Sequence, residues 1–142
     1  MSSISLVSAS TRVIGLESLT ALDSLIEAYP FKSYRNYRVL SRRRQDDVLR
    51  AELRAALEQP GGFGVTEDGK APAAAVVVRP LPWDSAFFGL SMARMYLLHN
   101  DQMPGAILRT LIAASFTECR DRGMRHLSVR IDVADADVIH AL

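Results

Sequence analysis

The stretch that decides the fold is residues 93–142, ARMYLLHNDQMPGAILRTLIAASFTECRDRGMRHLSVRIDVADADVIHAL. It predicts, in order, a strand ending at His99, a loop, a long helix over 106–123, a strand over 126–133 and the start of a helix from Ala134. A strand, a helix and a returning parallel strand form a right-handed crossover unit. Ligands of such units bind where the first strand meets the helix. Here that junction is Leu97 to Ala106.

The residues before this unit predict two helices and a strand meander. Apolar residues at three- and four-residue spacing indicate a helix over 18–29, and a second helix is expected from Asp46, as its N-cap, to Gln59. Residues 31–44, which connect the two helices, and residues 81–90, which lie between two of the strands, are expected to be irregular. Strands are predicted over four ranges: 11–14, 63–67, 71–81 and 91–99. This order predicts an α+β fold, a mixed sheet flanked by helices, in a single domain over residues 1–142.

The composition restricts the kind of protein this is. The chain has 142 residues, 49% of them hydrophobic, and a formal net charge of +1. That charge gives no general attraction to nucleic acid or anionic membranes, and no apolar run reaches the length of about 20 residues that spans a bilayer. A single cysteine, Cys119, excludes an internal disulfide and a multi-cysteine zinc site. We expect a cytoplasmic protein that binds neither nucleic acid nor membrane.

Two segments carry a resemblance to a known family. Residues 107–142, ILRTLIAASFTECRDRGMRHLSVRIDVADADVIHAL, resemble the helix, Arg-Gly turn, strand and following helix of the GNAT (Gcn5-related N-acetyltransferase) superfamily. Residues 81–94, LPWDSAFFGLSMAR, are similar to a segment of dTDP-fucosamine-type acetyltransferases. The resemblance implies a GNAT-like sheet, with acetyl-CoA as co-substrate and a primary amine, such as an amino sugar, as acceptor.

The chain departs from the family pattern at the cofactor loop. The family's R/Q-x-x-G-x-G/A offers backbone amides to the pyrophosphate, whereas this chain has NDQMPGA. Gly105 is its only glycine, Asp101 is negative, and Pro104 lacks an amide donor. The tyrosine that serves the family as general acid falls on Leu142, and the family's last two strands have no counterpart. We therefore expect the amino-terminal half of a two-part enzyme, weak or no binding of acetyl-CoA, and little activity of this chain alone.

Candidate binding residues follow from these patterns. The cofactor is assigned to the strand–helix junction. The substrate is assigned to the basic run of residues 32–44 and to the tryptophan of the segment 81–90. The cofactor residues are Leu97, Leu98, Asn100, Gly105 and Ala106, and the substrate residues are Arg42, Arg43 and Trp83. An ordinary loop and a solvated connection remain the alternatives for these two regions. The aromatic residues around Trp83 either shape an acceptor pocket or, as we favour, plug one end of the sheet.

No catalytic residue is assigned from the sequence, and no metal site. The three histidines share no ligand spacing, and His99 is the one we would mutate for function. Asp132, Asp135 and Asp137 suggest a helix N-cap, and Cys119 a buried small side chain. The rival function is a non-catalytic packing module. In either case we expect a homodimer formed through the edge of the strand over 126–133, or a catalytic domain that follows in the same chain.

Overall fold

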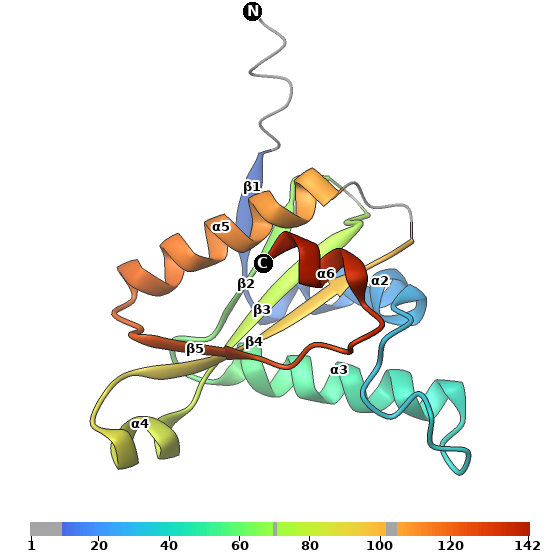
Figure 1. Ribbon diagram of the computed structural model, residues 1–142, viewed down its shortest axis with the longest axis horizontal. Helices are drawn as coiled ribbons and strands as arrows, with labels where there is room; N and C mark the ends of the chain where they lie inside the picture. The colour runs from blue at the N-terminus through green and yellow to red at the C-terminus, as the bar shows by residue number, and fades with distance from the viewer. Residues whose placement is uncertain (1–9, 70, 102–104) are drawn as a thin grey trace, which may run out of the picture.

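The computed structural model describes residues 10–69, 71–101 and 105–142 and confirms an α+β fold with a mixed sheet (Figure 1). The helices are one 3-10 helix and five α-helices: η1 Leu16–Leu22, α2 Asp23–Ala28, α3 Arg42–Glu58, α4 Pro82–Phe88, α5 Gly105–Asp121 and α6 Ala136–Ala141. The strands are β1 Thr11–Ile14, β2 Phe63–Glu67, β3 Ala74–Pro80, β4 Met92–His99 and β5 His126–Val129.

The five strands lie in sequence order in the sheet. Strands β1 to β4 form an antiparallel meander, and β5 pairs parallel to β4 after the crossover through α5. This is the crossover that residues 93–142 predict. The pairing of β4 with β5 is short, running from Met92↔His126 to Met95↔Val129. The strand predicted to reach Val133 therefore ends at Val129, because the chain leaves the sheet there to reach α6.

Helices cover both faces of the sheet, and each face has its own core (Figure 1). The α5 face holds residues such as Val76, Met95 and Leu97 together with Leu108 and Leu111 of α5. The α3 face holds the alternate residues, such as Val77 and Leu98, together with η1, α2 and α3. Successive strand residues point to opposite faces, so Val-rich β3 is buried on both sides. The same alternation determines which charged side chains of the strands lie on the same face of the sheet.

The start of α3 and the presence of α4 differ from the prediction, and capping residues account for both. Helix α3 begins at Arg42 rather than near Asp46, because the Ser41 hydroxyl accepts from the Arg44 amide at 3.2 Å and caps it. Residues 82–88, expected to be irregular, form α4. Its signals are Pro82 in the first turn and Gly89 at the C-cap, where a φ of 71° requires the left-handed region.

The aromatic residues of α4 do not plug the sheet. Trp83 is 89% exposed and Phe87 84% exposed, and no residue of α4 is buried. The helix projects from the β3–β4 connection, held by hydrogen bonds that Ser85 makes with the backbone of Met92. The preferred core role of these side chains is therefore wrong. Their exposure leaves an apolar surface available to a partner.

Candidate functional site

The second half of β4 is open along one edge. Strand β3 pairs with β4 over its whole length, from Pro80↔Ala93 to Ala74↔His99. On the other edge β5 pairs only as far as Met95, so within the described residues no strand pairs with Tyr96–His99 there. An open edge presents backbone donors and acceptors that an extended ligand can pair with. The predicted cofactor residues Leu97 and Leu98 lie in this open part.

A cavity of about 370 Å³ adjoins this opening. It lies between the α2–α3 connection, α3, β4 and the segment that follows β5. Its volume falls within the range of small-molecule sites. Aromatic and charged side chains dominate its lining, which comprises Tyr29, Phe31, Lys32, Ser33, Tyr34, Tyr37, Leu49, Glu52, Arg94, Met95, Tyr96, Leu97, Leu98, Arg130, Ile131 and Asp132.

Glu52 is the carboxyl group in this lining whose pKa is raised. It projects from α3, one turn before Ala56, and is half-buried. Burial raises the pKa of Glu52 above the usual range, although Arg130, Arg79 and Arg94 act in the opposite direction. A carboxyl group with a raised pKa in a cavity is a common feature of sites that transfer protons. Glu52 is therefore a candidate general base.

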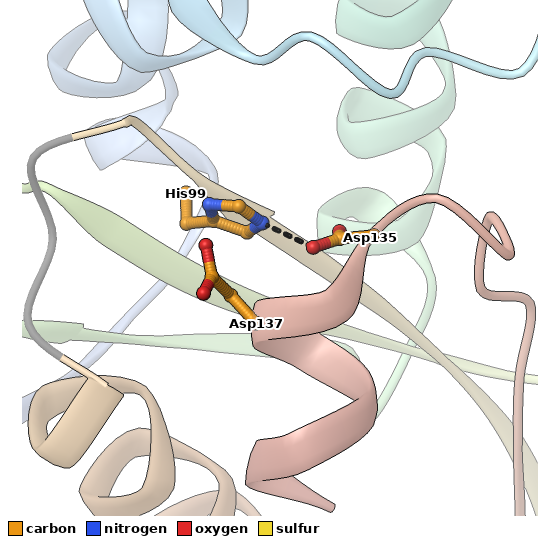
Figure 2. Close-up of side chains that lie close together, drawn as sticks. All are labelled: His99, Asp135 and Asp137. Carbon is orange, nitrogen blue, oxygen red and sulfur yellow. Dashed lines mark hydrogen bonds and ion pairs between the residues drawn. The ribbon is translucent and has the colours of Figure 1, made fainter.

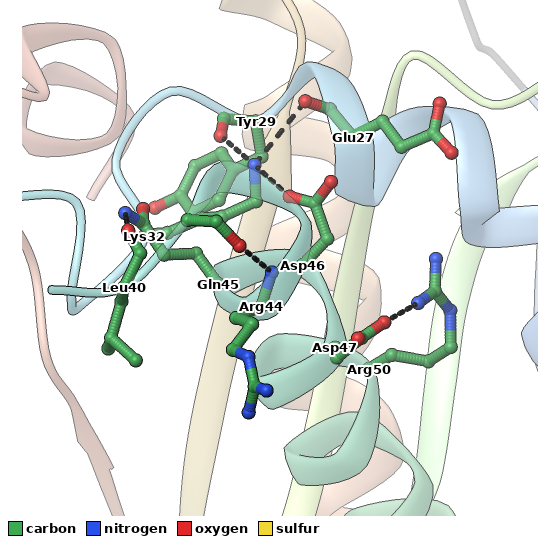
Figure 3. A network of polar contacts seen from close by, with 10 residues as sticks. Glu27, Tyr29, Lys32, Leu40, Arg44, Gln45, Asp46, Asp47 and Arg50 are labelled. Atoms are coloured by element: carbon green, nitrogen blue, oxygen red, sulfur yellow. Dashed lines mark hydrogen bonds and ion pairs between the residues drawn. The ribbon is translucent and has the colours of Figure 1, made fainter.

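Lys32 holds the α2–α3 connection, which forms one wall of this cavity, in place (Figure 3). Its ammonium donates to the Tyr29 and Glu27 carbonyls at 2.7 and 3.3 Å, and it forms an ion pair with Asp46 at 3.1 Å. Two hydrogen bonds and one ion pair therefore engage the ammonium inside the chain. Lys32, 8% exposed, thus ties the end of α2 to α3 and serves the fold rather than a ligand.

Two ion pairs tie the segment after β5 to the rest of the wall. Arg35 donates from Nε and Nη2 to Asp132 Oδ2 at 3.0 and 2.8 Å, and its guanidinium lies over the Phe31 ring. A hydrogen bond from Ala134 and the contact with Arg35 hold the pKa of Asp132 below its usual range. At the far end, His99 Nε2 lies 2.8 Å from Asp135 Oδ1 (Figure 2).

The His99–Asp135 pair closes the opening at the end of β4. Both side chains are buried, at 2% and 1% exposure, and the rings of Tyr29 and Phe31 lie beside the imidazole. Asp135 also caps α6 by accepting from the Val138 amide at 3.4 Å, which confirms the N-cap role predicted for one of these aspartates. The pair therefore positions α6 on the sheet.

His99, Asp135 and Asp137 together resemble a possible metal site. Potential ligand atoms of the three residues lie within 4.8 Å of one another (Figure 2). However, His99 Nδ1 lies 3.2 Å from the Asn100 carbonyl and Nε2 lies 2.8 Å from Asp135 Oδ1. Both ring nitrogens thus already have oxygen partners inside the chain. We assign this cluster a structural role.

Tyr29 adds a hydrogen-bond donor to the cavity. Burial, followed by the nearby charges of Asp135 and Asp132, raises the pKa of Tyr29 well above its usual value. The hydroxyl therefore stays protonated at neutral pH and can donate a hydrogen bond, but it is a poor proton donor in an acid-catalysed step.

Comparison with solved structures shows which fold this is. A Brucella melitensis biovar Abortus 2308 ribosomal-protein-alanine N-acetyltransferase matches with a TM-score of 0.64 and 14% identity, covering 94% of this chain and 87% of that chain. A Ralstonia eutropha JMP134 GCN5-related N-acetyltransferase matches with a TM-score of 0.66 and 17% identity, covering 92% and 88%. The chain has the GNAT fold. An aminoglycoside acetyltransferase, meta-AAC0020, from an uncultured soil metagenomic sample, solved in complex with sisomicin, matches with a TM-score of 0.62, 15% identity, and coverage of 92% and 82%.

Sequence comparisons add no closer relative: no protein-family model and no curated protein matches the chain. Identity to the solved structures is low, so they establish the GNAT fold rather than a substrate. Within the described residues, no helix has both the length and the apolar character needed to cross a bilayer.

The structure brings some of the predicted site residues together and separates others. Leu97 and Leu98 line the cavity, Asn100 directly follows β4, and Gly105 and Ala106 begin α5. The loop residues 102–104, including Pro104, lie outside the described residues. Arg42 and Arg43 are exposed on the first turn of α3, and neither they nor Trp83 line the cavity. Their predicted substrate role stays a prediction.

Sequence reasoning missed Glu52, Arg94 and Arg130, which line the cavity. Strand alternation could have placed Arg94 on the same face as Tyr96 and Leu98, but the partner elements were unknown. Cys119 is buried, as expected, and burial raises the pKa of its thiol to about 11. Its thiolate is therefore scarce at neutral pH, which argues against a nucleophilic role.

The contact between His99 and Asp135 gives a prediction about the stability of the fold. Asp135→Ala removes the helix cap and leaves a buried ring nitrogen of His99 without its hydrogen-bond partner, so we expect a loss of roughly 2–4 kcal/mol in the free energy of unfolding. Asp137→Ala is the matched control: it is exposed on the same helix and should cost less than about 1 kcal/mol. Chemical denaturation measures both. Equal losses in the two variants would contradict the role assigned to the buried pair.

Proposed function

We propose that this chain transfers an acetyl group from acetyl-CoA to a primary amine. The observation that carries the proposal is the open half of β4 directly beside a cavity lined by Glu52 and tyrosines. An extended cofactor arm can pair with the backbone at Leu97, which points to the open edge, while the amine occupies the cavity. Such an arrangement holds both reactants side by side, which is the main requirement for acyl transfer.

The start of α5 fits the phosphate end of the cofactor. A Cβ added at Gly105 would meet no atom of the described residues within 4 Å, so the space beside this position is open to a ligand. A helix N-terminus offers amide donors and partial positive charge to phosphate. Asn100, Gly105 and Ala106 would flank the pyrophosphate, and Leu97 and Leu98 would hold the arm. When bound, acetyl-CoA supplies an activated acetyl thioester.

Glu52 is the base in this proposal. An amine attacks only in its unprotonated form, so its ammonium must lose a proton before a bond to carbon can form. The Glu52 carboxylate faces the cavity and takes up that proton more readily than a solvent-exposed glutamate, because burial raises its pKa. The Tyr29 hydroxyl, which stays protonated, donates hydrogen bonds to a bound substrate.

Similar folds support an amine as the acceptor, and the aminoglycoside enzyme among them favours a small molecule. One neighbour is named an aminoglycoside acetyltransferase and was solved with sisomicin, and another is named for N-acetylation of an alanine. Both names describe acetyl transfer to nitrogen. We infer the same reaction type here, with an amine small enough for the cavity, such as an amino sugar.

The first prediction of this proposal concerns cofactor binding. We expect calorimetry to detect acetyl-CoA with a Kd weaker than micromolar, above about −8 kcal/mol, because the segment NDQMPGA has one glycine, Gly105. Gly105→Val should abolish this binding and leave the thermal midpoint unchanged, since its side chain meets nothing in the free protein. Ala136→Val, at the start of α6, is the control and should bind normally. Unchanged affinity in Gly105→Val would remove α5 from the cofactor site.

The second prediction concerns pH. Glu52 accepts a proton only above its pKa, so kcat/KM should fall as pH falls through that raised pKa, at a higher pH than the usual glutamate value near 4.3. Glu52→Gln should lower kcat by about 10²–10⁴ and remove this acid limb. Glu58→Gln, exposed on the same helix, should change neither. A limb that persists in Glu52→Gln would assign the base elsewhere.

Self-association is a second property that we propose, and the α4 surface favours it. Trp83, Phe87 and Phe88 are 89, 84 and 60% exposed on one short helix, where the only charged side chain is Asp84. Apolar surface of this kind marks interaction sites. With a net charge of +1 the chain does not repel a second copy strongly. This surface, with the outer edge of β5, also supports the rival role as a packing module.

The third prediction tests this association. Sedimentation at micromolar concentration should show a species of twice the 15.7 kDa chain mass. Replacing both Trp83 and Phe87 with serine should shift it to the monomer, because the apolar contact is lost. Val39→Ser is the control: that side chain is 90% exposed on the α2–α3 connection. A single 15.7 kDa species of the unaltered chain would contradict the dimer.

A further inference from the structure

Three arginines, on two neighbouring strands and on the segment that follows β5, lie near one end of the cavity, and two of them, Arg94 and Arg130, line it. Arg79 of β3 and Arg94 of β4 are paired directly opposite each other in the sheet. On its other side Arg94 pairs with Ser128 of β5, and Arg130 follows two residues later in the same chain segment. Residues two apart along a strand share a face, and diagonal neighbours across strands remain within reach of long side chains.

The core packing shows that all three arginines point to the α3 face. Ala75 and Val77 of β3 and Leu98 of β4 pack in the α3 core, which places Arg79 and Arg94 on that face by alternation. Leu127 and Val129 pack instead in the α5 core, so Ser128 and Arg130 alternate to the α3 face. Arg94 and Arg130 line the cavity, with Glu52 reaching toward them from α3.

This row of arginines has too little negative charge around it. Like charges directly opposite each other in a sheet are destabilising. The charges of all three guanidinium groups act on the Glu52 carboxyl group, which lies beside Arg94 and Arg130 in the cavity. The other charged groups of the lining are paired elsewhere, Asp132 with Arg35 and Lys32 with Asp46. Within the described residues, none of the three arginines forms an ion pair, so one carboxylate faces three cations.

The row is not placed for the cofactor's phosphates. Arg94 lies five residues before His99, which separates it from the end of β4 by about 17 Å at the rise of a strand. The pyrophosphate is expected beyond that end, at the start of α5. An excess of positive charge at the opposite end of the cavity therefore belongs to whatever the cavity itself binds.

We propose that the acceptor amine also carries an anionic group, a carboxylate or a phosphate, which Arg94 and Arg130 bind. This rests on the proposed acetyl transfer for the role of the cavity. Guanidinium groups bind both anions through paired hydrogen bonds. The body of the acceptor lies against the aromatic side chains of the lining, Tyr29, Phe31, Tyr34, Tyr37 and Tyr96. A purely cationic polyamine would face the arginines with like charge.

The test is equilibrium binding, by calorimetry, of matched pairs of amines that differ by the anionic group. The carboxylate pair is phenylalanine and 2-phenylethylamine, and the phosphate pair is glucosamine 6-phosphate and glucosamine. We expect the anionic member of at least one pair to bind at least about tenfold more tightly, and this preference to shrink with added salt. The pair that shows it identifies carboxylate or phosphate as the source.

The preference should disappear when the arginines are neutralised. Arg94→Gln and Arg130→Gln should each lower the affinity for the anionic member about tenfold, and Arg94→Lys should restore part of it. Arg54→Gln is the control, because Arg54 is exposed on the outer face of α3 and away from the cavity. Thermal midpoints that match the unaltered chain show that each variant is folded.

The outcomes separate this inference from the proposed activity. If neither pair shows a preference, or if the preference survives in the Arg94→Gln, Arg130→Gln double variant, the anion site is wrong, whether or not acetyl transfer occurs. If the preference is present and lost in the variants, the anion site stands. Failure to bind acetyl-CoA in a separate titration would then contradict only the proposed acetyl transfer.

Discussion

The parallel pairing of β4 with β5 stops after four residue pairs, and the candidate site depends on where it stops. If the ladder continued to His99, the β4 edge would be closed and no cavity could open beside it. Instead the chain turns away after Val129, toward α6. Backbone groups of β4 are left without a strand partner here, which costs free energy. A ligand that forms hydrogen bonds with these groups recovers that free energy.

Polar contacts keep the two diverging segments at a fixed separation. Lys32 holds the end of α2 on α3, Arg35 holds Asp132 after β5, and His99 holds Asp135 at the start of α6. Each joins residues far apart in the sequence except Lys32–Asp46. Lys32, Arg35 and His99 have their partners inside the chain. Among the described charged groups near the cavity, the arginines that line it therefore keep a positive charge without a matching ion pair. Structure and binding are thus divided between two sets of charged side chains.

Much of the fold was predictable because its signals are local. The apolar runs of β3 and α5, the Arg-Gly turn before β5 and the break after α3 each specify their own element. Helix α4 was missed although its Pro82 and Gly89 are ordinary helix signals, because the aromatic residues between them suggested a buried plug. Val133, predicted inside a strand, is 93% exposed. Apolar alternation continues past Val129, but it cannot show where a strand loses its neighbour.

The candidate site was predictable only in part. The strand–helix junction follows from topology, so Leu97 and Gly105 could be named in advance. The cavity could not, because Glu52, Arg94 and Arg130 come from three elements whose relative placement is set by tertiary packing. The basic run of 32–44 illustrates the difficulty: its cations look alike in the sequence, yet Lys32 is a buried anchor while Arg42 is exposed.

The most direct measurement is hydrogen exchange of the β4 amides with and without acetyl-CoA. If the open edge binds the cofactor, the amides of Leu97 and His99, which point away from β3, should exchange more slowly in its presence. Those of Ala93 and Met95, on the part of the same edge that β5 covers, should stay unchanged. Slower exchange confined to other elements, with Leu97 and His99 unaffected at saturating cofactor, would contradict the central claim that the open half of the β4 edge is the cofactor site.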